Sequence, residues 1–121
     1  MAYETNTATT ALTSKIYIEK GATTTPRTNI TGAAATLYLG EVDNRMNPDQ
    51  AIWLKMYNHA SPTNASDPLI ILYTAPSSIG RFVFPEGATF STALSVLVAT
   101  SPLVNQGTNP TNQVTVKLLA E

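Results

Sequence analysis

The amino-acid sequence predicts an all-β fold, a single antiparallel β-sandwich or jelly-roll of about seven to eight strands. Apolar and polar residues alternate with a period of two in several short segments, and turn residues separate these segments. No long stretch has the 3.6-residue periodicity of an amphipathic helix. The 121 residues fit one domain. We expect this domain to span residues 14–121.

The Thr-rich residues 1–13 have no apolar periodicity, so we expect a flexible or extended N-terminal arm ahead of the domain. Two interpretations stay open for this arm. It is a frayed terminus, or it reaches over a neighbouring subunit and becomes ordered there.

Two strands are expected in the first third of the domain, at residues 14–19 and 34–42, with an irregular loop over residues 22–32 between them. The first is expected to be half-buried, with Ile16 and Ile18 on one face and Lys15, Tyr17 and Glu19 on the other. The second is expected to place Leu37 and Leu39 on one face and Tyr38 and Val42 on the other.

The clearest alternation in the chain is at residues 51–59. We expect one face of this strand, Ile52, Leu54 and Met56, to lie in the core. The other face is expected to meet solvent or a second subunit, and it consists of Trp53, Lys55, Tyr57 and His59.

The C-terminal half predicts strands at residues 69–74, 81–84, 89–100 and 113–120. The Pro-Glu-Gly turn at residues 85–87 is expected to end a strand that carries Phe82 and Phe84 inward. Residues 89–100 are apolar on both faces, which is typical of a central strand covered on both sides. Its two expected faces are Leu94, Val96 and Val98, opposite Ala93, Leu97 and Ala99.

Composition excludes several classes of function. Seven basic and eight acidic residues give a formal net charge of -1, and neither sign forms a run, which argues against nucleic acid as a partner. The absence of cysteine excludes disulfides, a thiolate nucleophile and cysteine-ligated metals. The first residues lack the pattern of a secretory signal, and the apolar runs are too short for a transmembrane helix. The low charged fraction of 12% favours a surface that other proteins cover.

The sequence offers few groups for catalysis, so we expect no enzyme. The single histidine, His59, is interpreted as an exposed residue at a strand end. The alternative is a triad of His59 and Asp67 with Ser61 or Ser66, but no nucleophile-elbow motif accompanies these residues.

Two binding roles are weighed in the same way. The segment at 41–49 offers Glu41, Asp43, Asn44 and Asp49 as oxygen ligands for calcium, but their spacing matches no EF-hand, and such turn residues more often bond their own backbone. Trp53 and Tyr57 on one strand face form either a platform for sugar rings or part of a packed surface, and packing is favoured. We therefore expect no cofactor and no metal.

Four segments of the chain resemble small β-sandwich structural proteins of tailed bacteriophages. They are AIWLKMYNHASPT at 51–63, DPLIILYTAPSS at 67–78, FVFPEGATFSTALSVLV at 82–98 and QVTVKLL at 113–119. The resemblance implies a non-enzymatic homo-oligomer, often a trimer, located in the virion after assembly in the host cytoplasm. Its partners would be the major capsid protein or other virion proteins.

The expected function is accordingly that of a head decoration or cement protein that binds over capsomer junctions. The alternative is a carbohydrate- or receptor-binding module of a tail fibre or baseplate, with Trp53, Tyr57 and His59 as its contact face.

Overall fold

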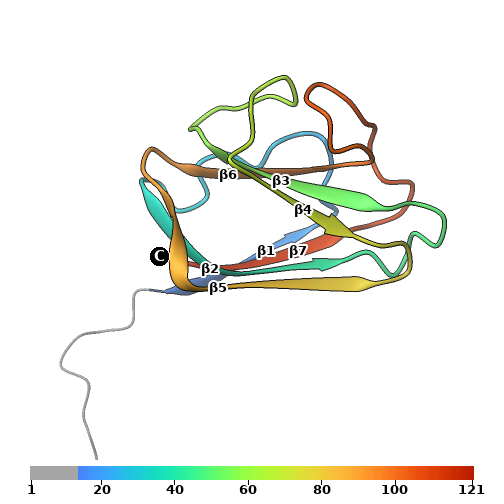
Figure 1. Cartoon of the computed structure of the whole chain (residues 1–121), viewed down its shortest axis with the longest axis horizontal. Helices are drawn as coiled ribbons and strands as arrows, with labels where there is room; N and C mark the ends of the chain where they lie inside the picture. Colours follow the sequence, from blue (N-terminus) through green and yellow to red (C-terminus); the bar gives the residue numbers. More distant parts are fainter. Residues whose placement is uncertain (1–13) are drawn as a thin grey trace, which may run out of the picture.

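The structure, a computed structural model, describes residues 14–121, and the predicted arm at residues 1–13 lies outside this part (Figure 1). The described residues form seven strands and no helix, which confirms the all-β prediction. The strands are β1 Lys15–Lys20, β2 Ala35–Asp43, β3 Ile52–Asn58, β4 Ile70–Thr74, β5 Ile79–Phe90, β6 Leu94–Ala99 and β7 Thr115–Ala120. No helix that could cross a membrane is therefore present between residues 14 and 121.

The strands build a β-sandwich of two antiparallel sheets. The four-stranded sheet has the order β1-β7-β2-β5, and the three-stranded sheet has the order β4-β3-β6. Figure 1 shows the two sheets as separate layers, with β6, β3 and β4 above the other four strands. The chain changes sheet between β2 and β3, and again after β4, β5 and β6.

The core lies between the two sheets, where their inner faces bury apolar side chains. The predicted inward face of β3 is confirmed, since Ile52, Leu54 and Met56 are fully buried. They share one cluster with Leu37 and Val42 of β2. Strands β6 and β7 complete the layer with Leu94, Val96, Val98, Val116 and Leu118. This layer explains how seven short strands form one domain.

Strand β6 is buried on both faces, as predicted, but it is not central in its sheet. Its second neighbour is the irregular segment 22–30. Arg27 N donates to Val96 O at 2.8 Å, Val96 N donates to Arg27 O at 3.0 Å, and Val98 N donates to Thr23 O at 3.0 Å. The expectation of a central strand was wrong because a loop without regular alternation supplies these hydrogen bonds.

The predicted grouping of side chains on the two faces of β1 is confirmed, whereas the predicted faces of β2 are corrected by the structure. Ile16 and Ile18 are exposed on the outer face of the four-stranded sheet, and Tyr17 packs against the core. In β2 the register shifts between Leu37 and Leu39, so Leu37 is buried and Leu39 lies on the outer face. A β-bulge reverses the side-chain alternation beyond it, and period-two reasoning therefore fails there.

The Pro-Glu-Gly segment does not end a strand. Strand β5 continues through it from Ile79 to Phe90, and the chain leaves this strand only at residues 91–93. Val83 faces Leu39 and Ala88 faces Leu37, so residues 84–87 of β5 are opposed by Tyr38 alone. The extra residues bend the strand, and Gly87 adopts a φ of +81° within the bulge.

We expect Leu54→Ala to lower the free energy of unfolding by about 2–4 kcal/mol, because it leaves a cavity in the layer between the sheets. Chemical denaturation measures this loss. The matched control is Val83→Ala on β5, where the side chain is 66% exposed. Its effect should stay within about 0.5 kcal/mol. Equal effects of the two variants would contradict the assignment of the core.

Gly87→Ala is expected to destabilise the fold more than Gly21→Ala. Both glycines have φ near +80°, which is unfavourable for alanine by about 1 kcal/mol. A methyl group at Gly87 would also lie 2.4 Å from Thr36 Cγ2, whereas nothing lies within 4 Å of one at Gly21. Thermal and urea unfolding should therefore show a loss of at least about 2 kcal/mol for Gly87→Ala. A loss no greater than that of Gly21→Ala would exclude the crowding of the bulge.

Candidate interaction surfaces

The outer face of the three-stranded sheet is covered by two loops of the chain itself. Lys55 is only 1% exposed, and Tyr57 is fully buried. The expectation that Lys55 and Tyr57 meet solvent or a second subunit was therefore wrong. The loops at residues 60–68 and 101–112 lie over these side chains, and each loop supplies an oxygen atom that accepts a hydrogen bond from Lys55. The alternation of the strand does not reveal these loop partners.

Lys55 is the centre of this cover. Its Nζ donates to Asn64 Oδ1 at 3.0 Å and to the carbonyl oxygen of Leu103 at 2.7 Å, with Gln106 O at 3.4 Å. Asn64 in turn donates to Gln106 O at 3.0 Å, so the two loops are tied to each other as well as to β3. Burial lowers the pKa of Lys55, because desolvation disfavours the charged amine.

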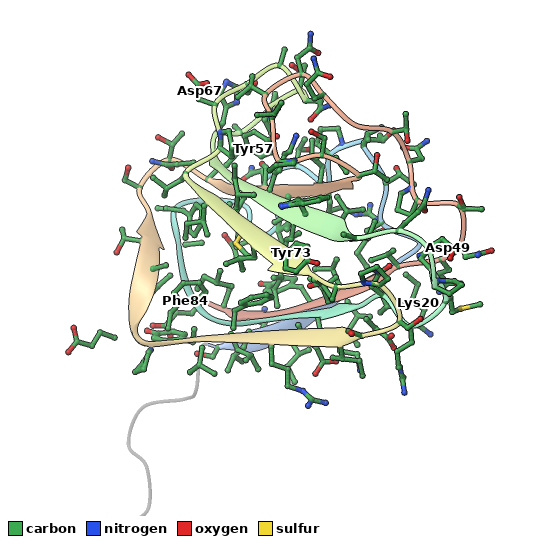
Figure 2. The ribbon with its side chains drawn as sticks, turned by 45° about the vertical axis from the view of Figure 1, so that its right-hand side comes forward. Lys20, Asp49, Tyr57, Asp67, Tyr73 and Phe84 are labelled. Carbon is green, nitrogen blue, oxygen red and sulfur yellow. The ribbon has the colours of Figure 1, made fainter. Side chains whose placement is uncertain are left out.

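Tyr57 does not form the aromatic platform considered from the sequence. It packs with Leu97 and Ala99 beneath the loops, where burial raises its pKa. Its hydroxyl has no hydrogen-bond partner within residues 14–121. Figure 2 shows Tyr57 near the loop that carries Asp67, away from Tyr73 on β4. The ring that meets Trp53 is Tyr73, with centroids 5.3 Å apart and planes inclined by 56°.

An exposed apolar surface lies along β4, beside the loops. We call it the β4 strip, and it consists of Leu69, Ile71, Tyr73 and Trp53. Alternation along the strand turns Leu69, Ile71 and Tyr73 outward, with exposed fractions between 40% and 55%. Trp53 lies opposite Tyr73 in the register of β3 and β4. Aromatic and branched apolar side chains of this kind are typical of protein contact surfaces.

A second apolar surface crosses the outer face of the four-stranded sheet. One residue of each strand contributes, since Ile16 pairs with Leu119, Leu119 with Leu39, and Leu39 with Val83. We call this set the apolar row. Ile16 is 68% exposed, and a shallow hollow of about 120 Å³ lies between Ile16, Leu39 and Leu119. The alternation of β7 and the bulge of β2 together align these side chains.

Next to the apolar row lies a row of alternating charges. Lys117, Glu41 and Arg81 are neighbours across β7, β2 and β5. Arg81 Nε donates to Glu41 Oε2 at 2.8 Å, and Lys117 Nζ lies 4.0 Å from Glu41 Oε1. Exposed pairs of this kind add little stability, but they fix the side chains that border the apolar row.

A cleft of about 230 Å³ opens between the sheets beside β1. Its apolar walls are Tyr17, Ile30, Val96, Val116 and Leu118. An ion pair between Glu19 of β1 and Arg27 of the segment that covers β6 lies at the same cleft. The cleft marks the place where the edges of the two sheets separate.

The structure does not bring the residues of the hypothetical triad together. His59 Nδ1 accepts a hydrogen bond from Ser61 N at 2.8 Å, and Ser66 Oγ accepts one from Thr63 N at 3.0 Å. No hydrogen bond or ion pair joins His59 to a carboxylate within the described chain. These contacts are those of local turns.

The oxygen ligands considered for calcium do not converge either. Asp43 is engaged by Arg45 at 2.9 and 3.0 Å, and this guanidinium lowers the pKa of the carboxyl group. Glu41 pairs with Arg81, while Asn44 is buried and donates to Gln50 O at 2.7 Å. Asp49 is exposed. No group of three or more acidic, histidine or cysteine side chains that could hold a metal ion occurs between residues 14 and 121.

Sequence reasoning missed a network of asparagines near this turn. Asn47 Nδ2 donates to Asn44 Oδ1 at 3.0 Å and to the carbonyl oxygen of Asn112 at 3.0 Å. Asn112 N donates to Asn47 Oδ1 at 2.8 Å. The network ties the turn after β2 to the loop before β7. Three asparagines flanked by turn residues are a weak signal, because surface loops have the same composition.

Comparisons of the chain with protein-family models, with curated proteins and with solved structures find no match.

We expect Lys55→Met to lower the free energy of unfolding by about 1–3 kcal/mol, because Asn64 Oδ1 loses the amine that donates to it and the carbonyl oxygens of Leu103 and Gln106 each lose one of their donors. Limited proteolysis should then cut the loops at 60–68 and 101–112 faster. Lys20→Met, at an exposed strand end, is the control and should change stability by less than about 0.5 kcal/mol.

The pH dependence of this variant has a defined sign. Because the pKa of Lys55 is lowered on folding, the native state binds fewer protons than the unfolded state between the folded pKa and the ordinary value of 10.5. The contribution of Lys55 to the free energy of unfolding therefore rises with pH in that range, and it is lost as the pH falls through the folded pKa. The deficit of Lys55→Met relative to the wild type should grow as the pH is raised. A deficit that shrinks would contradict the burial of a charged amine.

Proposed function

We propose that this chain is a non-enzymatic structural subunit of a tailed-bacteriophage particle, a head decoration or cement protein that binds over capsomer junctions. It acts as a homo-oligomer whose contacts with the major capsid protein hold neighbouring subunits together. Such a role requires rigidity and contact surfaces, and it requires no reaction.

The observation that carries the proposal is the exposure of apolar side chains on both outer faces of the sandwich. The apolar row belongs to the four-stranded sheet and the β4 strip belongs to the three-stranded sheet, so they face in opposite directions. One subunit can therefore contact two neighbours at once. Modest contacts at several points become persistent attachment when they act together.

The remaining surface fits a subunit of an assembly. Charged residues form 12% of the chain, and the exposed loops are rich in Thr, Ser and Asn. Neutral polar loops suit a protein that is held in place by partners, since high charge would oppose close packing of copies. Two of the groups considered for catalysis, His59 and Ser66, accept hydrogen bonds from the backbone of local turns.

A second candidate function is recognition of a carbohydrate or receptor by a tail fibre or baseplate. The contact between the half-buried Trp53 and the exposed Tyr73 favours it, because sugar rings stack on aromatic faces. The inclination of 56° gives this pair two separate faces in place of one flat platform. This function would use the β4 strip alone and leave the apolar row without a role.

Cosedimentation with phage capsids that lack a decoration protein tests the proposal. We expect the wild type to be recovered with the particles, and Val83→Arg and Ile71→Arg each to weaken recovery at least about tenfold, because a buried charge opposes an apolar contact. Thr92→Arg, in the exposed turn before β6, is the control and should bind normally.

The same experiment separates the two candidates. A protein that ignores capsids, binds a glycan on an array and loses that binding on Trp53→Ala would replace the first proposal by the second. A protein that binds neither would remove both.

A further inference from the structure

Three of the four sheet edges in the described chain are closed to further strand pairing. Strand β6 is hydrogen-bonded by the segment 22–30. Strand β5 carries the bulge at residues 84–87, and β4 has only five residues between Pro68 and Pro76. Covered, bulged and short edges are the usual means by which sheets avoid pairing with other chains.

Strand β1 has none of these protections. All six of its residues pair in register with β7, from Lys15 opposite Ala120 to Lys20 opposite Thr115, with no bulge and no Pro or Gly. No strand within residues 14–121 pairs with its other side. Arg27 reaches Glu19 through its side chain only, since its backbone is bonded to β6. The outer side of β1 is therefore a straight row of backbone donors and acceptors.

The sequence of β1 is complementary to itself when read in the opposite direction. In Lys15-Ile16-Tyr17-Ile18-Glu19 the apolar residues are symmetric about Tyr17, and the two ends carry opposite charges. If two copies align antiparallel with Tyr17 opposite Tyr17, each Ile16 meets an Ile18 and each Lys15 meets a Glu19. Opposite charges and apolar pairs in direct cross-strand contact stabilise a sheet.

The faces of the sheet permit this register and disfavour its neighbours. Ile16 and Ile18 both lie on the outer face, so their pairing keeps side chains on the correct side. A shift by one residue would place Ile16 opposite Glu19 and Lys15 opposite Lys20, which mixes the two faces and opposes like charges. A shift by two residues keeps the faces, but it forms one Ile–Ile pair in place of two and no Lys–Glu pair. The complementarity thus favours the alignment at Tyr17.

We propose that β1 is a self-association edge, at which two copies of the chain pair antiparallel about a twofold axis at Tyr17. The two four-stranded sheets then form one continuous sheet. The exposed Ile16 and Ile18 of each copy cover each other and join the two apolar rows. Each Lys15 reaches the Glu19 of the second copy, which already pairs with Arg27 beside the cleft.

This inference does not rest on the proposed role in a phage particle. A monomer that binds capsids would overturn the self-association edge and leave the proposed attachment to the capsid intact. A dimer that ignores capsids would do the reverse.

Sedimentation equilibrium of the full chain over a range of concentrations gives the first test. We expect a reversible dimer, or an assembly with an even number of copies. A monomer at all concentrations or an odd-numbered oligomer would overturn the proposal.

A charge exchange tests the alignment. Because of the twofold axis, each substitution alters two contacts. Lys15→Glu alone and Glu19→Lys alone should each raise the dimer Kd at least about tenfold, and the double variant should return to within about threefold of the wild type. The melting temperature of each variant verifies folding, since Glu19→Lys also removes the pair with Arg27. Failure of the double variant to recover would contradict the alignment.

The matched control is Lys20→Glu, at the other end of the same strand. In the proposed register Lys20 faces Ser14 of the second copy, so this variant should leave the Kd unchanged. In the register shifted by one residue, Lys20 faces Lys15, and the same variant would tighten the dimer. A tightened dimer would therefore exclude the proposed register.

Disulfide trapping gives a second measurement that does not depend on charge. The chain has no cysteine, so Tyr17→Cys introduces a single thiol, placed at the twofold axis. Oxidation should yield a covalent dimer, as seen on a non-reducing gel. Lys20→Cys should remain monomeric on the gel, because its two copies would lie about 20 Å apart along the strands. Trapping through Lys20→Cys but not through Tyr17→Cys would overturn the proposal.

Discussion

The apolar layer between the two sheets is the contact on which the rest of the structure depends. Four of the six connections between strands pass from one sheet to the other, so each sheet is assembled from segments that are distant in sequence. Neither sheet can bury its inner face alone. The side chains of β3, above all Leu54 and Met56, therefore join the two sheets, and they do so in a chain without cysteine.

A polar arrangement governs the outer side of the three-stranded sheet. Lys55 is buried with no carboxylate partner among residues 14–121. Its amine donates to an amide oxygen of one loop and to backbone carbonyl oxygens of the other. A buried amine of this kind fixes its partners because any displacement leaves polar groups without a hydrogen bond. The loops then cover Tyr57, and among the strands of this sheet the exposed large apolar side chains within residues 14–121 are Ile71 and Tyr73 of β4.

The sequence predicted the sandwich and most strands because regular alternation is sufficient to locate half-buried strands. Prediction failed where other constraints set the side-chain faces. The bulge at Tyr38 reversed the face of Leu39, and the irregular segment 22–30 acted as a neighbour of β6. The aromatic pair considered from the sequence was wrong, since Tyr57 is buried and the ring that meets the half-buried Trp53 is Tyr73 of another strand. The cover that the loop at 101–112 gives to Lys55 depends on contacts across more than forty residues, which local patterns do not encode.

The position of β7 has a consequence for biosynthesis. This last strand in chain order lies between β1 and β2, and β1 has no other strand neighbour in the described sheet. During synthesis, β1 therefore leaves the ribosome about a hundred residues before β7, the strand with which it pairs. The pairing of β1 with β7 is therefore a late step in the formation of this sheet.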